Sequence, residues 1–390
     1  MHTVPLSFAL LTIVGYWRPV EWPKNSLKYW LYNVFSISTF VLLVIFSLWN
    51  SVAAIKSEDV SMLLDKLTLS FSILGVSGKI VNLFIRRGDL IRITNSLLQE
   101  VCIPRDQQEM FIQQKFNNFT RFFLLTVWCE ILNEITVFFA TIARISAFMK
   151  TRSLPLTTWV PYDLSNSFVY WISYIYQTLM LVICANTSVA HETLISGLMI
   201  ETCSQLEILG HRFRNFPSLL LKAQKKCTSP EELRIIERKM ISDNVRHHLE
   251  IYEFALNLND IFSIVMFMQF SISAMVLALS VYGMSKTPLV SFKFAWGLFY
   301  LMSMLMQVFL YCWFGNEVTL KVENVYEMDW TVLPVNVMKG LVIIIARCTR
   351  PIKISSCHIL VFSAEAFTSV SRMRTIIPIF IKYLLFTYNL

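Results

Sequence analysis

The chain has 390 residues, of which 55% are hydrophobic and only 15% are charged, and its formal net charge is +8. Soluble domains carry about 25% charged residues, so this composition excludes an ordinary soluble protein. The charged residues gather in a few segments and almost vanish from stretches of about 20 residues, the length that a helix needs to cross a bilayer. The sequence therefore predicts an all-α, polytopic membrane protein.

Seven apolar segments predict seven transmembrane helices. In chain order, the first four cover roughly residues 29–49, 63–85, 122–145 and 168–190. The fifth and sixth cover roughly residues 261–282 and 294–314. The last is irregular, because an apolar run over residues 335–346 is followed by a basic break and then by a second apolar stretch from Ile354 onward. We treat residues 1–390 as one seven-helix domain.

The basic residues are unevenly distributed between the two sets of connections. If the N-terminus is cytoplasmic, 22 Lys and Arg lie on the cytoplasmic side and 7 on the other. Cytoplasmic connections carry an excess of Lys and Arg, so the sequence predicts a cytoplasmic N-terminus and an extracellular C-terminus. The positive net charge then reflects Lys and Arg that face the cytoplasm and the anionic lipid headgroups there. We therefore expect no nucleic-acid partner.

The longest connection, residues 207–260, joins the fourth and fifth spans and is predicted to be cytoplasmic. It contains nine basic and eight acidic residues, a balance that is untypical of a nucleic-acid site. Ser229 and Pro230 have the pattern of a helix N-cap and first helical position, with acidic residues directly after them. We therefore expect the two spans to continue beyond the membrane as a pair of helices.

The sequence contains no HExxH, GxSxG, GxGxxG or P-loop motif, and its eight cysteines form no CxxC pair. We expect neither enzymatic activity nor a cofactor or metal. His247 and His248 are adjacent, point about 100° apart on a helix, and are predicted to be an exposed pair. Glu130 and Glu134 share a face of the third span, either as structural polar contacts or as a solute or ion site.

The fourth span mixes aromatic and polar residues near its predicted external end. Tyr170, Tyr174 and Gln177 share one helical face, and Trp171 flanks it. This pattern fits an interfacial aromatic belt with helix packing. It also fits the wall of a pocket for a small volatile ligand, mostly apolar with a few polar groups that orient the ligand. Candidate ligand contacts on other spans, chosen by depth and direction, are Ser70, Phe71, Leu74, Phe138, Phe139 and Ile142.

Several motifs occur in order along the chain. They are Gly15-Tyr-Trp-Arg-Pro before the first span, His191-Glu-Thr-Leu-Ile-Ser-Gly-Leu after the fourth, His247-His-Leu-Glu-Ile-Tyr-Glu-Phe before the fifth, and Gln307-Val-Phe-Leu-Tyr-Cys-Trp-Phe-Gly-Asn-Glu-Val with Val325-Tyr-Glu-Met-Asp-Trp from the sixth onward. In this order and spacing they resemble the insect odorant receptor family, and the resemblance covers nearly the whole chain. A gustatory-receptor-like channel and a seven-transmembrane G-protein-coupled receptor are the alternatives.

The resemblance implies a subunit of an odorant-gated, non-selective cation channel that assembles as a tetramer with the co-receptor Orco. It implies an odour pocket in the outer half of the bundle and a location in the plasma membrane of olfactory sensory neurons. Residues 333–390 would contain an anchor helix, where subunits meet, followed by a last helix that lines the pore. Candidate pore residues are Arg374, Ile377 and Ile381.

The C-terminal tail departs from the family pattern. The segment that begins at Ser363 fits the family's last helix, but the Tyr-Ser motif expected after Val370 is missing. Arg372, Arg374 and Pro378 follow instead. An alternative exon or gene-model error, an end that leaves the membrane, or a changed pore would each explain the difference. Because arginine in a pore repels cations, we expect this chain to conduct poorly.

Overall fold

In the computed structural model the chain is a bundle of long helices. The structure describes residues 4–120, 154, 156, 159–227, 229–288, 291–324, 338, 355–356 and 360–361. The helices are α1 (Pro5–Val14), α2 (Leu27–Ile55), α3 (Val60–Ile85), α4 (Arg87–Ser96), α6 (Ser167–Lys226), α7 (Pro230–Ser285) and α8 (Phe292–Asn324). Residues 107–120 are also helical. The two short strands β1 (Ser355–Ser356) and β2 (Leu360–Val361) pair antiparallel.

Five of the seven predicted spans coincide with described helices: the first with α2, the second with α3, and the fourth, fifth and sixth with α6, α7 and α8. Four described helices, α2, residues 62–85 of α3, α6 and α7, are long and apolar enough to cross a membrane. Large apolar side chains cover the outside of α2, where Trp30 and Val34 are each 63% exposed. The predicted all-α membrane fold is confirmed. The third span lies outside the described residues, and so does the seventh apart from residues 338, 355–356 and 360–361.

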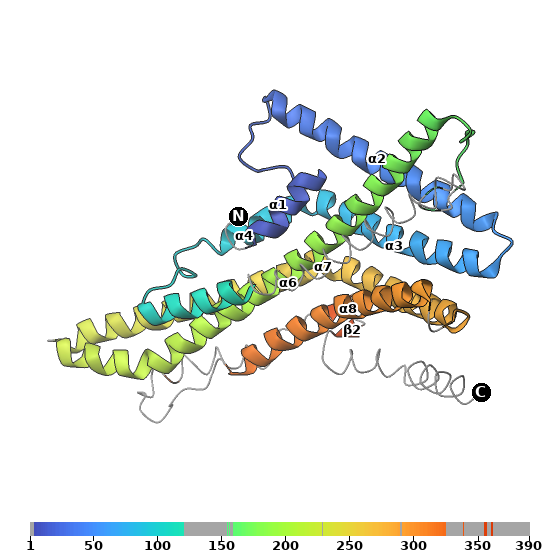
Figure 1. Ribbon diagram of the computed structural model, residues 1–390. Coiled ribbons are helices and arrows are strands. Elements are labelled where there is room, and N and C mark those ends of the chain that lie inside the picture. Colours follow the sequence, from blue (N-terminus) through green and yellow to red (C-terminus); the bar gives the residue numbers. More distant parts are fainter. Residues whose placement is uncertain are drawn as a thin grey trace, which may run out of the picture.

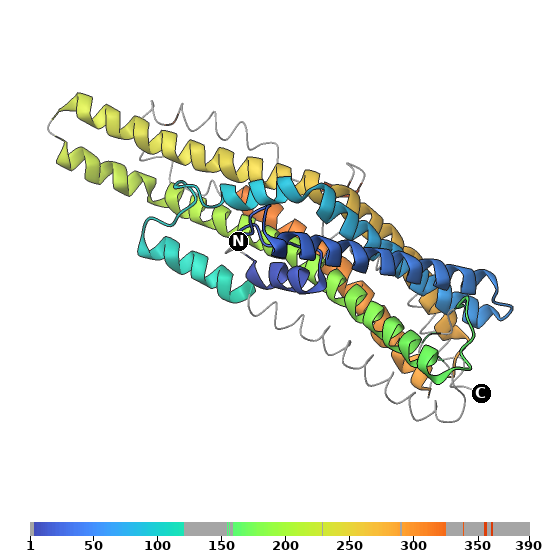
Figure 2. The same ribbon diagram turned by 90° about the horizontal axis from the view of Figure 1, so that it is seen from above.

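Helices α6 and α7 form one long hairpin. They contain 60 and 56 residues, so each is about 85–90 Å long, roughly three times the thickness of the hydrocarbon layer. The Ser229 side chain accepts a hydrogen bond from the Glu232 N–H, and Pro230 opens α7. Both views show the two helices side by side, with their turn far from α2 (Figures 1 and 2). The predicted pair of extended helices is confirmed.

The two ends of the bundle are packed differently. We call the end where α2 joins α3 the outer end, and the end from which the hairpin extends the inner end. The largest apolar cluster surrounds α6 toward the inner end, where residues 189–206 are all buried. Val4, directly before α1, packs on Gly197, and the hydroxyls of Ser7 of α1 and Thr193 of α6 are 2.8 Å apart. Toward the outer end, the described residues form two smaller clusters.

Candidate functional site

The aromatic face of α6 lies at the outer end of the bundle. Tyr170 and Tyr174 are buried, and their rings are 6.2 Å apart. Gln177 is buried on the same face, whereas Trp171 is 41% exposed and its ring is 5.7 Å from the rings of both tyrosines. Leu154 packs with the two tyrosines. The three residues predicted to share a face therefore share a buried one.

The chain that leads into α6 closes over this aromatic face. Gln177 Oε1 accepts a hydrogen bond of 3.2 Å from the Leu156 N–H. The hydroxyls of Tyr162 and Ser173 are 2.7 Å apart. These contacts fix the entry segment on the outer end of α6, so Gln177 positions the covering chain in addition to any role with a ligand.

The three candidates on α3 differ in their surroundings. The Ser70 hydroxyl accepts a hydrogen bond of 2.7 Å from Asn50 Nδ2, which ties α3 to α2. Phe71 is half-buried, and Leu74 is 51% exposed. Phe138, Phe139 and Ile142 lie outside the described residues, as do Glu130, Glu134 and the pore candidates Arg374, Ile377 and Ile381. Their roles stay predictions.

Sequence reasoning missed a polar contact that joins α3 to α8. The hydroxyls of Ser72 and Tyr300 are 2.6 Å apart. The Ser72 hydroxyl also donates to the Thr68 carbonyl at 3.0 Å, so Tyr300 is the donor to Ser72, and the Tyr300 oxygen can still accept from a further partner. A serine in the second span and a tyrosine in the sixth give no signal by themselves that they meet, because 228 residues separate them.

Two glutamines make a second polar contact inside the bundle. Gln269 Nε2 of α7 donates to Gln307 Oε1 of α8 at 2.9 Å and to Ser273 Oγ at 3.1 Å. Gly75 of α3 faces Gln269, whose Oε1 would lie 3.7 Å from a Cβ at that position. The sequence signal for this contact was the presence of two amides within apolar spans, because polar groups in a membrane need partners from neighbouring helices.

A buried ion pair links α3 to α6. Lys79 Nζ lies 2.7 Å from Glu192 Oε1, and the side chains are 1% and 3% exposed. Ser188 joins both groups, because its hydroxyl accepts from Lys79 at 2.8 Å and donates to Glu192 at 2.9 Å. Glu192 is therefore the partner of Lys79 among the described residues.

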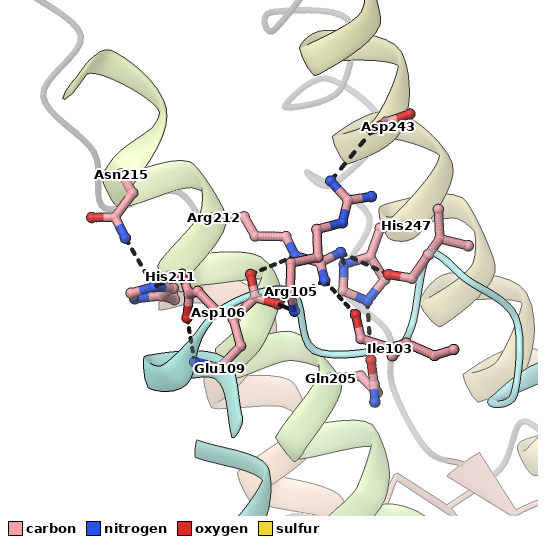
Figure 3. A network of polar contacts seen from close by, with 11 residues as sticks. Ile103, Arg105, Asp106, Glu109, Gln205, His211, Arg212, Asn215, Asp243 and His247 are labelled. Carbon is pink, nitrogen blue, oxygen red and sulfur yellow. Dashed lines mark hydrogen bonds and ion pairs between the residues drawn. The ribbon is translucent and has the colours of Figure 1, made fainter. Parts of the chain in front are cut away.

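A larger polar network lies beyond the spans, where α6 and α7 meet the segment after α4 (Figure 3). Arg212 of α6 uses all five of its N–H donors. Two bind the carboxylate of Glu109 at 2.8 Å each, and two bind the carbonyls of Val101 and Ile103 at 2.7 and 3.0 Å. The fifth binds His247 Nδ1 of α7 at 3.0 Å. Arg212 therefore connects three separate parts of the chain.

The network fixes the tautomer of His247. Because its Nδ1 accepts from Arg212, the ring hydrogen is on Nε2, which donates to Gln205 Oε1 at 3.0 Å. Gln205 Nε2 in turn donates to Glu201 at 3.2 Å. Burial, followed by the charge of Arg212, lowers the pKa of His247 to about 2, and burial raises the pKa of Glu201. The histidine is neutral at physiological pH.

The expectation of an exposed histidine pair is wrong. His247 is fully buried and His248 is 5% exposed. Their burial follows from the hairpin, whose α7 packs on α6 and on the segment after α4. Among the described residues, no group of three or more His, Cys, Asp or Glu could hold a metal ion.

A small hollow lies beside this network, between α4, α6 and α7. It is lined by residues that include Cys102, Gln205, Glu250 and Phe254, and it has essentially no room for a water molecule. Pockets for small molecules are usually about 300–1,000 Å³. The hollow is therefore smaller than a typical ligand site, and it lies away from the aromatic face of α6.

The fold and its buried polar contacts are those of a polytopic helical membrane protein. Family comparison gives the more specific assignment: the family profile described as 7tm Odorant receptor matches residues 59–374. The chain therefore belongs to the odorant receptor family, in agreement with the resemblance seen in its motifs. This membership also confirms that the chain is not an enzyme.

Two relatives that resemble the chain in sequence are odorant receptors. The chain is 25% identical over 187 residues to Odorant receptor Or1 of Anopheles gambiae, an alignment that covers 44% of this chain and 45% of that protein. It is 28% identical over 185 residues to Odorant receptor 46a, isoform A, of Drosophila melanogaster, covering 45% of each. The chain thus spans a little less than half the length of these two relatives.

The fold matches a solved insect receptor over almost its full length. The olfactory receptor OR5 from Machilis hrabei superposes with a TM-score of 0.80 at 18% identity, covering 98% of this chain and 97% of that one. The structure of the same receptor in complex with eugenol gives a TM-score of 0.81 at 17% identity, with the same coverage. At this identity the likeness establishes the shared fold.

Proposed function

We propose that the chain is the odour-binding subunit of a ligand-gated, non-selective cation channel that assembles with the co-receptor Orco. Its place would be the plasma membrane of olfactory sensory neurons, with the N-terminus in the cytoplasm. Membership of the odorant receptor family supports the receptor role. The full-length fold match to an insect olfactory receptor is consistent with it.

The observation that carries the proposal is a set of hydrogen-bonding groups within an apolar bundle. Ser72 and Tyr300 share one hydrogen bond, and the Tyr300 oxygen can still accept a hydrogen bond from a ligand. The aromatic face with Tyr170, Tyr174 and Gln177 supplies apolar surface at the same end. Such a site suits a small volatile molecule with an apolar body and one hydrogen-bonding group. The predicted contacts Ser70, Phe71, Leu74, Trp171, Phe138, Phe139 and Ile142 belong to this proposed region.

Gating would follow from differential binding. A ligand shifts a channel toward its open state only if it binds that state more tightly than the closed state. A ligand that inserts between the Ser72 and Tyr300 hydroxyls would alter the contact between α3 and α8. Movement of these two helices relative to each other is a direct way to transmit binding to the rest of the subunit.

Electrical recording from cells that express this chain with Orco tests the proposal. The odour panel should contain aliphatic and aromatic volatiles, including eugenol, the ligand in the Machilis receptor structure. We expect current in response to some panel members only when both subunits are present. Odour-evoked current that is unchanged when the chain is omitted would contradict the proposal.

Two single-hydroxyl variants test the ligand site with any active odour. Ser72→Ala and Tyr300→Phe should each raise the half-maximal odour concentration about 3- to 10-fold, the effect of losing one hydrogen bond. Ser38→Ala is the matched control, because the Ser38 hydroxyl binds the Phe35 carbonyl of its own helix. Unchanged dose–response curves for both variants, with normal surface expression, would show that the ligand does not bind at these two hydroxyls.

The proposed channel includes a last helix whose sequence is unusual. The family match ends at residue 374, next to the point where the tail departs from the family pattern. We propose that Arg374 lies near the pore with Ile377 and Ile381 and reduces cation flow. A version with a family-like tail should then carry larger odour-evoked currents than this chain at equal surface expression. Equal currents from the two versions would contradict the expected conduction defect.

A further inference from the structure

Two arginines lie together at the inner end of the bundle, where α2 begins and α3 ends. Arg87 Nη2 donates to the Arg18 carbonyl at 2.6 Å. Arg18 Nη1 donates to Asn33 Oδ1 at 2.6 Å, and its guanidinium lies 3.7 Å from the centre of the Tyr29 ring. Burial, followed by the charge of Arg18, lowers the pKa of Arg87. The two like charges are thus held close enough to affect one another.

Neither arginine has an anionic partner within the described part of the chain. The nearby carboxylate of Asp89 pairs with Arg86 and Arg92, at 3.3 and 3.5 Å. Arg86 also pairs with Asp260. No ion pair to a described carboxylate is formed by Arg18 or Arg87. Like charges that are partly shielded from water repel one another, so an arrangement of this kind is stabilised by an anion between or beside them.

The surroundings of the pair are aromatic. The Arg87 guanidinium lies 5.1 Å from the centre of the Trp17 ring, and Trp17 is 2% exposed. The Tyr32 hydroxyl donates to the Trp17 carbonyl at 3.0 Å. These contacts fix the backbone of the segment before α2 and hold both guanidinium groups in place. Arg18 and Arg87 are each only partly buried, so the pair remains open to its surroundings.

Exposed apolar surface begins directly beside the arginines. Leu27 and Leu31 at the start of α2 are 73% and 61% exposed. Ile85 at the end of α3 is 73% exposed, and Val81 one turn earlier is 41% exposed. A basic pair at the edge of two lipid-facing helices places positive charge where lipid headgroups lie, with acyl-chain surface next to it.

We propose that Arg18 and Arg87 form a binding site for the phosphate group of an anionic membrane phospholipid. The guanidinium groups would bind the phosphate oxygens, and the acyl chains would lie along Leu27, Leu31 and Ile85. Arginine suits this role because its planar group binds phosphate through two N–H donors at once. With the predicted orientation, the lipid belongs to the cytoplasmic leaflet, which is rich in anionic lipid.

Native mass spectrometry of the full chain in mild detergent tests the proposal. Dioleoyl phosphatidylserine or dioleoyl phosphatidylcholine is added over a range of concentrations. We expect tighter binding of the serine lipid by the parent chain, and about 10-fold weaker binding by Arg18→Gln/Arg87→Gln. The matched control is Lys225→Gln/Lys226→Gln, which removes the same charge from two exposed residues at the far end of α6. Equal loss in both double variants would show a general charge effect and overturn the proposal.

A second measurement uses the unaltered chain, so it holds even where the variants fail to fold. A photoactivatable phosphatidylserine should label peptides that contain residues 17–31 or 81–88, and unlabelled phosphatidylserine should reduce that labelling. Inorganic phosphate at millimolar concentration should leave it largely unchanged, because the acyl chains contribute to binding. Labelling confined to other peptides, or full displacement by phosphate, would overturn the lipid site. These outcomes are independent of odour responses and of the proposed channel function.

Discussion

Arg212 and Glu109 form a doubly hydrogen-bonded ion pair, 2.8 Å at each contact, between residues 103 positions apart in the sequence. The side chains are 6% and 3% exposed. Because Arg212 also binds two carbonyls and His247, it holds the segment after α4 against both arms of the hairpin (Figure 3). This segment follows the second span, so the pair couples a membrane helix to the extended part of α6 and α7.

Removal of Arg212 should strongly destabilise the chain. Arg212→Met leaves the Glu109 carboxylate buried without its partner, and breaking a buried pair in this way costs about 3–5 kcal/mol. Arg212→Lys should rescue little, because an ammonium group has three donors and cannot reproduce the planar contacts. The thermal unfolding midpoint of the purified full chain measures both effects.

The matched control for this prediction is Arg214→Met, two positions along the same helix. The Arg214 side chain is 44% exposed and lies 3.4 Å from Glu207. Exposed pairs contribute roughly 0–1 kcal/mol, so this variant should unfold close to the parent. Similar midpoints for the Arg212 and Arg214 variants would show that the network contributes little to stability.

Acidification should weaken the folded chain through His247. Burial, followed by the charges of Arg212 and Arg105 and of His248, lowers its pKa from 6.5 to about 2. The unfolded chain takes up this proton near pH 6.5, while the folded chain does not. Stability therefore falls as the pH drops below about 6.5, by up to about 1.4 kcal/mol per pH unit.

The variant His247→Asn isolates this contribution. The raised pKa of Glu201 acts in the opposite sense, so the variant and the parent are compared at each pH. When the pH is lowered from 7.5 to 5.5, the thermal unfolding midpoint of the parent should fall further than that of the variant. The same loss in both proteins would mean that His247 is not the titrating group.

The ion pair between Lys79 and Glu192 should show strong non-additivity. Lys79→Met leaves a buried carboxylate and Glu192→Leu leaves a buried ammonium, each at a cost of about 3–5 kcal/mol. The double variant removes both charges, and such replacements are often neutral. The midpoint of the double variant should therefore lie above those of both single variants. Strictly additive losses in this double-mutant cycle would count against coupling of the pair.

Gly15 should resist substitution because of its backbone conformation. Its φ is +102°, and a Cβ there would lie 2.7 Å from Phe35 Cε1. Gly15→Ala should lower stability by about 1–2 kcal/mol or more, from the left-handed conformation and the clash. Gly88→Ala is the control, since Gly88 lies in α4 with open space around it and alanine favours helix. An unfolding midpoint for Gly15→Ala at or above that of Gly88→Ala would contradict this prediction.

The long hairpin was predictable because its signals are local. Apolar stretches mark the fourth and fifth spans, and Ser229 with Pro230 marks the start of α7 through backbone geometry that two or three residues determine. The aromatic face of α6 was predictable for the same reason, since helical spacing alone places Tyr170, Tyr174 and Gln177 together. Helical spacing gave no indication that the segment around Leu156 covers Gln177.

The contacts between spans were not predictable in the same way. Ser70 was expected near a ligand, and its hydroxyl binds Asn50 of the neighbouring helix. Ser72, two residues further on, is the serine that meets Tyr300. Positions two apart on a helix point about 200° apart, and helical spacing alone does not say which neighbouring helix each serine faces.

By itself, the sequence determined that the chain is a helical membrane protein. It also determined the positions of five of the described helices and that two of them extend beyond the bilayer. These properties depend on hydrophobicity and local backbone preferences, which neighbouring residues set. Only the tertiary structure decided that His247 is buried and neutral, that Lys79 pairs with Glu192, and that Arg212 reaches Glu109. Such partners come from distant parts of the chain, and their identity depends on how the helices pack.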